Sequence, residues 1–343
     1  MPTTPSTSLP PLGNAAKRKH GLQLPAMEPP KRPRRGARDS AASSSILPLG
    51  DELTLSPSVS AAIQSERWRL TSPARHMRLL EYATPRVRYL YESDYPGDRA
   101  AQGLRGVLAA DPPDWEPDPN KIQEVLTGSR KCVTQQRSGL SWITEVSRPI
   151  LQAAIGDLPL ESWGVLTETA SAYQPLYTAR DHCNRNIDWV VGFPEEQWET
   201  FYGSAAAKFR SPFINHVDHP HTGTQVLGCG CVIKPPGGNL LEAQVQLGVW
   251  TAGFFSWAFQ HRSGTQSPPP MIGIISVGDI WGFYIVYAVQ QEADDGVNRD
   301  VGEVRVWGPL PELGGRCSTQ KMSVMLVKNV RRVMEYVCGG YID

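Results

Sequence analysis

The run Asn186-Ile187-Asp188-Trp189-Val190-Val191 is short and apolar, and Asp188 is its only acid. A second strand-like run ends at Cys231-Val232-Ile233-Lys234, with a lysine as its last residue. After prolines and glycines, a helical pattern begins at Leu241-Glu242-Ala243-Gln244-Val245-Gln246. Short apolar runs between turn residues favour buried strands, and apolar residues at three- and four-residue spacing favour a helix. We therefore expect two strands followed by a helix whose first turn carries a carboxylate.

The patterns around this stretch are helical first and strand-like afterwards. Two long helical patterns, 240–260 and 319–337, interrupt or close the strand series. This order predicts an α/β (α+β) fold with a central mixed sheet flanked by helices, made of a helical part at about 58–156 and a sheet core at about 160–343. Residues 101–118 contain several prolines and are expected to form a loop. The other expected helices are 58–70, 74–82, 121–127 and 133–155, the last broken near Pro149, and the expected strands are 162–167, 187–193, 225–233, 271–276, 281–289 and 303–307.

The N-terminal tail, residues 1–50, differs in composition from the rest of the chain. It is rich in Pro, Ser and Arg and contains no aromatic residue, so it is expected to be disordered. The whole chain has 34 basic and 34 acidic residues, but residues 1–40 alone carry a net charge of +6, which leaves −6 for the remainder. A mildly acidic folded part argues against a broad phosphate-binding surface there.

Two basic clusters lie within this tail, Lys17-Arg18-Lys19 and Lys31-Arg32-Pro33-Arg34-Arg35. Their spacing resembles a bipartite nuclear localisation signal, which implies a nuclear import receptor as partner. The alternative is a solvated basic tail that touches DNA or RNA non-specifically. We expect a nuclear location, or otherwise a cytoplasmic one. The residues of the predicted signal are Lys17, Arg18, Lys19, Lys31, Arg32, Arg34 and Arg35.

Neither the cysteines nor the hydropathy pattern indicates secretion or a membrane. The six cysteines lack the density of a disulfide framework, which favours a reducing compartment. No signal-peptide core begins the sequence, and no apolar run approaches the roughly 18 residues of a membrane span. We expect a monomeric protein that is neither secreted nor bound to a membrane.

The order of several short motifs is similar to that of fungal PD-(D/E)XK nuclease-like domain proteins, members of the restriction-endonuclease-like superfamily. The similarity runs from about residue 58 to the C-terminus. It implies a restriction-endonuclease-like fold in which an Asp and a Glu hold Mg²⁺ and a Lys assists phosphodiester cleavage. The motifs are Ser72-Pro73, Ala83-Thr84-Pro85-Arg86-Val87, Ser141-Trp142, Ile187-Asp188, Ile214-Asn215-His216, Ile233-Lys234, the helix start at Glu242, and Trp281.

The active-site pattern that this resemblance implies is incomplete. Asp188 fits the first acid and Lys234 fits the lysine, but Val232 occupies the place of the metal-binding Glu. Ile143 and Ser147 also stand where the family shows Asn and His. An isopropyl group cannot bind a metal ion, so we predict a degenerate site.

Two other acids could replace the missing ligand. Glu242, or the amide of Gln246, could reach inward from the helix after the lysine, and Glu145 could do so from the opposite helix. If the site is active, the candidate catalytic residues are Asp188, Lys234 and Glu242. Asp188 and Glu242 would then be the ligands of Mg²⁺.

Other polar groups favour different chemistry less well. A zinc site from His216, His219, His221, Cys229 and Cys231 matches no standard spacing. The pair His182-Cys183 lacks a residue to orient the histidine as a base. Trp250 and Trp281 fall on apolar faces, which favours the core over a base-stacking surface.

Three functional hypotheses follow. The first is a pseudoenzyme that acts as a nuclear binding or regulatory module and contacts DNA or RNA near Lys234. The second is an active Mg²⁺-dependent nuclease in which the acid has moved to Glu242. The third is an accessory protein of a fungal biosynthetic pathway.

Overall fold

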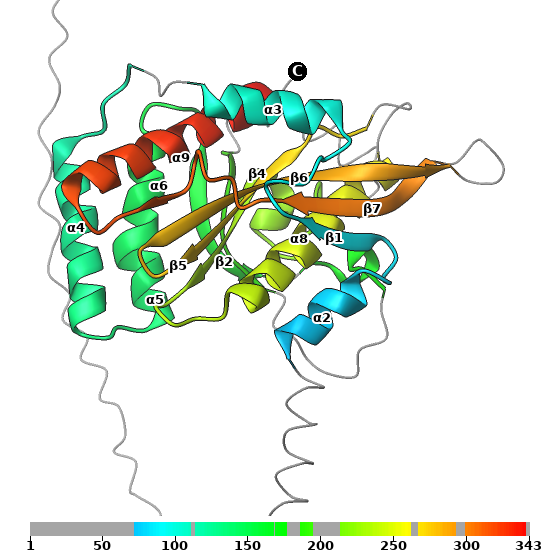
Figure 1. Ribbon diagram of the computed structural model, residues 1–343, viewed down its shortest axis with the longest axis horizontal. Helices are drawn as coiled ribbons and strands as arrows, with labels where there is room; N and C mark the ends of the chain where they lie inside the picture. Colours follow the sequence, from blue (N-terminus) through cyan, green and yellow to red (C-terminus); the bar gives the residue numbers. More distant parts are fainter. Residues whose placement is uncertain are drawn as a thin grey trace, which may run out of the picture. The chain divides into compact units, whose positions relative to one another are not determined.

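A mixed sheet of eight strands forms the centre of the structure, a computed structural model (Figure 1). The structure describes residues 72–110, 114–167, 169–176, 186–194, 213–261, 267–292 and 299–340. The tail at 1–50 with its basic clusters, the helix expected at 58–70, and the pair His182-Cys183 lie outside these residues. The strands are β1 (Arg86–Leu90), β2 (Glu161–Thr167), β3 (Ile187–Phe193), β4 (Val226–Lys234), β5 (Met271–Val277), β6 (Ile280–Glu292), β7 (Arg299–Trp307) and β8 (Gly315–Arg316).

The strand order across the sheet is β1-β7-β6-β5-β4-β3-β2, and β8 pairs with one end of β6. Strands β2, β3 and β4 are antiparallel neighbours, whereas β5 runs parallel to β4. A parallel neighbour requires a crossover connection, and the long helix α8 (Leu240–His261) provides it. The predicted α/β sheet with flanking helices is therefore confirmed.

Helices cover both faces of the sheet (Figure 1). One apolar cluster joins α2 and α8 to one face, and a second joins α3, α4, α6 and α9 to the other. None of the described helices is long and apolar enough to span a membrane. The remaining helices are α2 (Pro73–Leu80), α3 (Arg99–Ala109), α4 (Pro119–Thr134), α5 (Gly139–Trp142), α6 (Arg148–Ile155) and α9 (Gln320–Gly340), with a π-helical turn η1 (Ile143–Ser147) and 3₁₀ turns η2 (Ser171–Tyr173) and η3 (Thr222–Thr224).

The alternation of side chains along β4 divides its residues between the two clusters. Val232 lies in the cluster under α8, and Gly230 packs against Trp250 of that helix. Cys231 and Ile233 lie in the opposite cluster, because successive strand residues point to opposite faces. Lys234 returns to the α8 side, where it meets Glu242.

The six predicted strands are all present, but the loop expected at 101–118 is wrong over 101–109. Residues Arg99–Ala109 form α3, whose N-cap Asp98 accepts a hydrogen bond from the Ala101 N–H at 2.7 Å. Its Ala101, Leu104 and Leu108 side chains are buried, so tertiary packing outweighs the low helix propensity of its two glycines. The helix expected at 133–155 is interrupted at 135–138, after α4, and then continues without a break through α5, η1 and α6, so the break expected at Pro149 is wrong.

Two helical glycines allow the packing constraint to be tested. A Cβ atom on Gly128 of α4 would lie 2.1 Å from the carbonyl oxygen of Glu145, whereas one on Gly103 of α3 would have no neighbour within 4 Å. Gly128→Ala is therefore expected to destabilise the fold by about 1–3 kcal/mol, despite the better helix propensity of alanine. Gly103→Ala, the matched control, should stabilise it by about 0.5–1 kcal/mol. Urea denaturation measures both, and equal effects would contradict the packing of α4 against η1.

Candidate functional site

Asp188 lies near the start of β3, partly buried beside the end of β4. Its Oδ2 atom accepts a hydrogen bond from the backbone N–H of Ile233 at 2.7 Å. Burial raises the pKa of the Asp188 carboxyl, and the negative charge of Glu242 adds to this, while the Ile233 bond and the charge of Lys234 act in the opposite direction. The carboxylate is therefore held where its charged form is disfavoured.

Lys234 ends β4, and its ammonium group faces the first turn of α8. The Nζ atom lies 2.9 Å from Oε1 of Glu242, and the lysine side chain is only 15% exposed. Asn239 holds this turn, because its Oδ1 atom accepts a hydrogen bond from the Glu242 N–H at 3.2 Å. The positive end of the helix dipole also favours a carboxylate at this position. The structure therefore brings Asp188, Lys234 and Glu242 together. A shared active site made of these three candidate residues would require this proximity.

Val232 lies on β4 two residues before Lys234, and its side chain is part of the core. Its side chain is 0% exposed and belongs to the apolar cluster under α8. The neighbouring polar group from the helix is Gln246, which is 1% exposed and whose Oε1 atom has no hydrogen-bond partner in the described structure. On α8, Gln246 lies one turn after Glu242 and one turn before Trp250, on the same face. This face meets Lys234 and Gly230 at its two ends, which places Gln246 over the region of Val232.

The Asn215-His216 segment supports α8 and supplies no group to the acid. The Asn215 side chain donates to the carbonyl groups of Thr222 and Gln225 at 2.6 and 2.8 Å and accepts from the Val217 N–H at 2.7 Å. His216 is fully buried, and burial lowers its pKa to about 3, so the ring is neutral at physiological pH. It packs edge-on against Trp250 and Phe254, with ring centroids 4.7 and 5.8 Å apart.

The other proposed ligands are not assembled. Glu145 forms an ion pair with Arg137, and its charge acts on Cys132 of α4 rather than on Asp188. Cys229 and Cys231 belong to the cluster on the face opposite α8, whereas His216 packs on α8 itself, so these three do not converge on one point. His219 instead accepts hydrogen bonds at Nδ1 from the backbone of His221 and Thr222, both at 3.3 Å.

The donor set does not fit the magnesium site that the resemblance implies. Mg²⁺ requires near-octahedral oxygen donors, typically from one or two carboxylates, with water and substrate oxygens completing the set. Here one Asp188 oxygen is used by Ile233, and the Glu242 carboxylate is used by Lys234. No group of three or more His, Cys, Asp and Glu residues suited to a metal ion occurs in the part of the chain that the structure describes.

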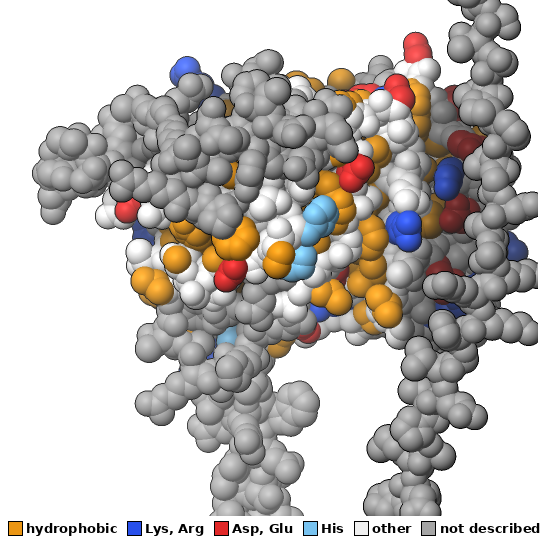
Figure 2. All heavy atoms as spheres, turned by 180° about the vertical axis from the view of Figure 1, so that it is seen from behind, with side chains coloured by type: hydrophobic (Ala, Val, Ile, Leu, Met, Phe, Trp, Pro, Cys, Tyr) orange, Lys and Arg blue, Asp and Glu red, His pale blue; other side chains and the backbone are white. Residues whose placement is uncertain are grey.

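Acidic and basic side chains are intermixed on the face of the molecule shown in Figure 2. On the face shown in Figure 2, described acidic and basic side chains are scattered among apolar ones and do not gather into a basic area. Nucleic-acid binding depends largely on neutralising phosphates with Lys and Arg. This face therefore offers no extended track for a phosphate backbone among its described residues.

The unfavourable position of the Asp188 charge gives a pH-dependent prediction. Because burial raises the folded-state pKa above the usual 3.8, folding favours the protonated acid, and this stabilisation is lost as pH rises through the folded pKa. Asp188→Asn cannot ionise and can still accept the Ile233 hydrogen bond. Urea denaturation should show Asp188→Asn to be more stable than the wild type at pH 7, with the difference shrinking toward pH 3. A difference independent of pH would contradict the raised pKa.

Comparison with known proteins places the chain in a family. A search of curated proteins finds no match to it. A family model described as the PD-(D/E)XK nuclease superfamily matches residues 86–342, which include every strand of the sheet as well as Asp188, Lys234 and Glu242. The sheet, with its antiparallel β2-β3-β4 unit, the α8 crossover and the parallel β5, agrees with that assignment. The chain belongs to the PD-(D/E)XK nuclease superfamily.

Proposed function

We propose that this protein uses the nuclease fold as a binding or regulatory module and does not cleave phosphodiester bonds. The observation that carries the proposal is the position of Val232, whose side chain is 0% exposed where the resemblance implies the second metal-binding acid. An apolar side chain there removes a ligand and also excludes the water that a hydrated Mg²⁺ ion keeps. A single carboxylate, Asp188, is left on the strands of the candidate site.

The arrangement of Lys234 supports the same proposal. In the active pattern the lysine stabilises charge that develops on the phosphoryl group. Here its ammonium group already faces Glu242 at 2.9 Å, so its charge is compensated by the protein itself. The pair joins the end of β4 to the first turn of α8 and serves as a structural contact.

The proposed setting is the nucleus of a fungal cell, where an import receptor would bind the two basic clusters of the tail. DNA or RNA is the proposed partner of the module, with a contact near Lys234. The clusters around Lys17 and Arg34 support the first point by composition alone. The scattered charges in Figure 2 favour a local contact with nucleic acid over an extended one.

A second candidate function is metal-dependent cleavage of nucleic acid with Glu242 as the displaced acid. Two observations favour it: the charge of Glu242 acts on Asp188, and the buried Oε1 atom of Gln246 lacks a partner. It requires that Asp188→Ala and Glu242→Ala each abolish cleavage while Val232→Ala does not. No contact in the described structure favours the remaining hypothesis, an accessory role in a fungal biosynthetic pathway.

Restoring the missing acid tests the first proposal. Residue 232 points to the same face as Lys234, so Val232→Glu would place a second carboxylate beside Asp188. Without metal this variant should lose about 2–4 kcal/mol, because a carboxyl group replaces a buried isopropyl group. At about 100 times its Kd, Mn²⁺ should then raise the Tm of the variant by about 5 °C or more.

Two comparisons make this test decisive. Val232→Gln has a side chain of similar size without the charge, so its Tm should not respond to Mn²⁺. The wild type should not respond either. A wild-type Tm that rises with Mn²⁺ and stops rising in Asp188→Ala would overturn the proposal. Gln246→Glu, which approaches the same region from α8, replaces Val232→Glu if that variant does not fold.

A further inference from the structure

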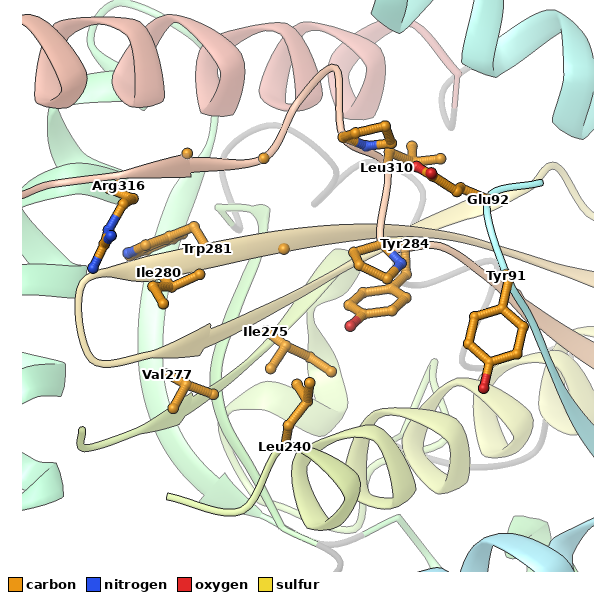
Figure 3. Close-up of a pocket in the computed structure, with 15 residues that line it drawn as sticks. Tyr91, Glu92, Leu240, Ile275, Val277, Ile280, Trp281, Tyr284, Leu310 and Arg316 are labelled. Carbon is orange, nitrogen blue, oxygen red and sulfur yellow. The ribbon is translucent and has the colours of Figure 1, made fainter. Parts of the chain in front are cut away.

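An apolar pocket of about 850 Å³ lies beside the start of α8 (Figure 3). Its floor is the α8-side face of the β5–β6 hairpin, with Ile275 and Val277 on β5 and Ile280, Gly282 and Tyr284 on β6. Leu240 forms one wall at the start of α8. The pocket exists because α8 begins only at Leu240 and leaves this end of the hairpin uncovered.

Residues that line the pocket are direct neighbours of residues of the candidate site. Val277 is the register partner of Lys234 in the β4–β5 pair, and the N–H of Gly278 donates to the Lys234 carbonyl at 2.8 Å. Leu240 precedes Glu242 by two residues in the first turn of α8. Any occupant of the pocket therefore lies next to the groups that the family uses for chemistry.

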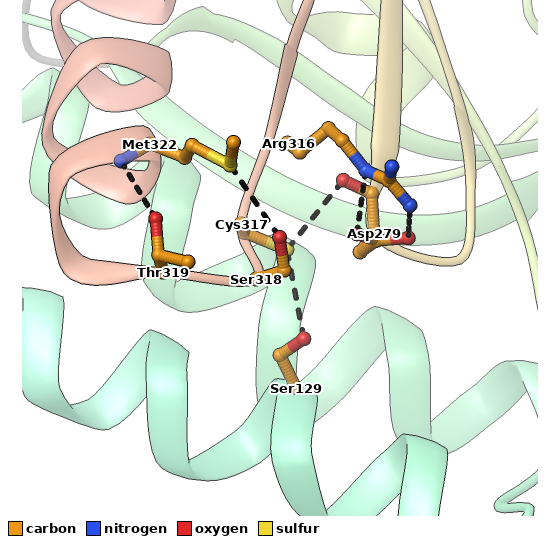
Figure 4. Close-up of polar contacts among 7 residues, drawn as sticks. All are labelled: Ser129, Asp279, Arg316, Cys317, Ser318, Thr319 and Met322. Carbon is orange, nitrogen blue, oxygen red and sulfur yellow. Dashed lines mark hydrogen bonds and ion pairs between the residues drawn. The ribbon is translucent and has the colours of Figure 1, made fainter.

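Hydrogen bonds hold the wall opposite α8, residues 309–316, in place. The N–H of Leu310 donates to the Phe283 carbonyl at 2.8 Å, and Asn329 of α9 donates to the Leu313 carbonyl at 2.9 Å. The end of this wall is fixed at Arg316, which forms two hydrogen bonds with Asp279 at 2.9 and 3.2 Å (Figure 4). The cavity is thus formed before any ligand binds, which lowers the entropic cost of binding.

The lining specifies an uncharged occupant. Its two charged side chains, Glu92 and Arg316, lie at opposite ends of the pocket, and Arg316 is already neutralised by Asp279 (Figure 3). Two aromatic rings, those of Tyr91 and Tyr284, lie toward the Glu92 end of this space. An anionic ligand would find no free positive charge along these walls, and only Glu92, at one end, could face a cation, whereas flat apolar rings would bury surface against them.

Several apolar side chains at the rim of the pocket are partly exposed to solvent. Tyr91 is 75% exposed, Ile280 52% and Leu240 46%. Covering these side chains would be favourable, at roughly 25 cal/mol for each square ångström of apolar surface removed from water. A volume of about 850 Å³ falls within the range of roughly 300–1,000 Å³ for sites that enclose small organic molecules.

We propose that this pocket binds an uncharged, ring-containing lipophilic small molecule. The inference goes beyond the proposed function, because it assigns a ligand to the end of the sheet where the superfamily binds metal and phosphate. It holds whether or not the site cleaves nucleic acid. Bound there, the ligand would contact Leu240 and Val277 and would shield the Lys234–Glu242 pair from water.

A neutral fluorescent probe tests this proposal on the full chain. N-phenyl-1-naphthylamine should bind saturably with one site per chain and with increased emission. Ile280→Glu should weaken this binding at least tenfold, because it places a carboxylate against the apolar ligand. Tyr91→Ser, at a residue that is 75% exposed, should weaken it as well and provides a second variant if Ile280→Glu does not fold.

The matched control is Met322→Glu on α9, where the native side chain is 46% exposed and lies outside the pocket lining. Its affinity for the probe should equal that of the wild type. Non-saturable binding to the wild type would overturn the proposal. So would equal affinity in Ile280→Glu, Tyr91→Ser and Met322→Glu, or stronger binding of the anionic probe 1-anilinonaphthalene-8-sulfonate than of the neutral one.

Discussion

The packing of Trp250 on Gly230 determines where α8 crosses the sheet, and the polar groups of the candidate site depend on that crossing. A Cβ atom at residue 230 would lie 2.6 Å from the indole ring, so only glycine allows this approach. The neutral ring of His216 also packs edge-on against this indole, at a centroid distance of 4.7 Å. With the helix fixed there, the earlier turns of α8 place Gln246 over the region of Val232 and Glu242 against Lys234.

Under the proposed function, this geometry accounts for a nuclease fold that is kept without a nuclease active site. Val232 belongs to the same apolar cluster as α8, so the position where the resemblance implies a metal ligand contributes packing to the core. Asp188 is retained even though burial disfavours its charge, and its bond to Ile233 satisfies a backbone N–H at the end of β4. The apolar pocket lies beside the start of α8, next to these polar groups.

Much of the fold could be predicted from the sequence because the strands are short apolar runs bounded by turn residues. The helix α3 was missed because Gly103, Gly106 and the prolines after residue 110 resemble a loop, whereas burial of Leu104 and Leu108 makes the segment helical. The two-residue strand β8 is too short to carry a pattern. The approach of Glu242 to Lys234 was predictable from its place early in the helix, although its functional role stays a prediction.

Other features depend on contacts between distant segments, which local patterns do not encode. The structural role of Asn215 requires carbonyl groups from Thr222 and Gln225. The Oε1 atom of Gln246 is buried without a hydrogen-bond partner because α8 packs closely on the sheet. The walls of the pocket come from three segments that are distant in the sequence: the start of α8, the β5–β6 hairpin and residues 309–316.

An assay of nucleic-acid cleavage tests directly whether this protein lacks nuclease activity. The purified full chain would be incubated with labelled single- and double-stranded DNA and RNA, with and without Mn²⁺, beside Asp188→Ala. Because buried Val232 stands where the resemblance implies the second acid, we expect no cleavage under any of these conditions. Cleavage by the wild type that requires both Mn²⁺ and Asp188 would contradict this expectation, and its loss in Glu242→Ala would then identify Glu242 as the displaced acid.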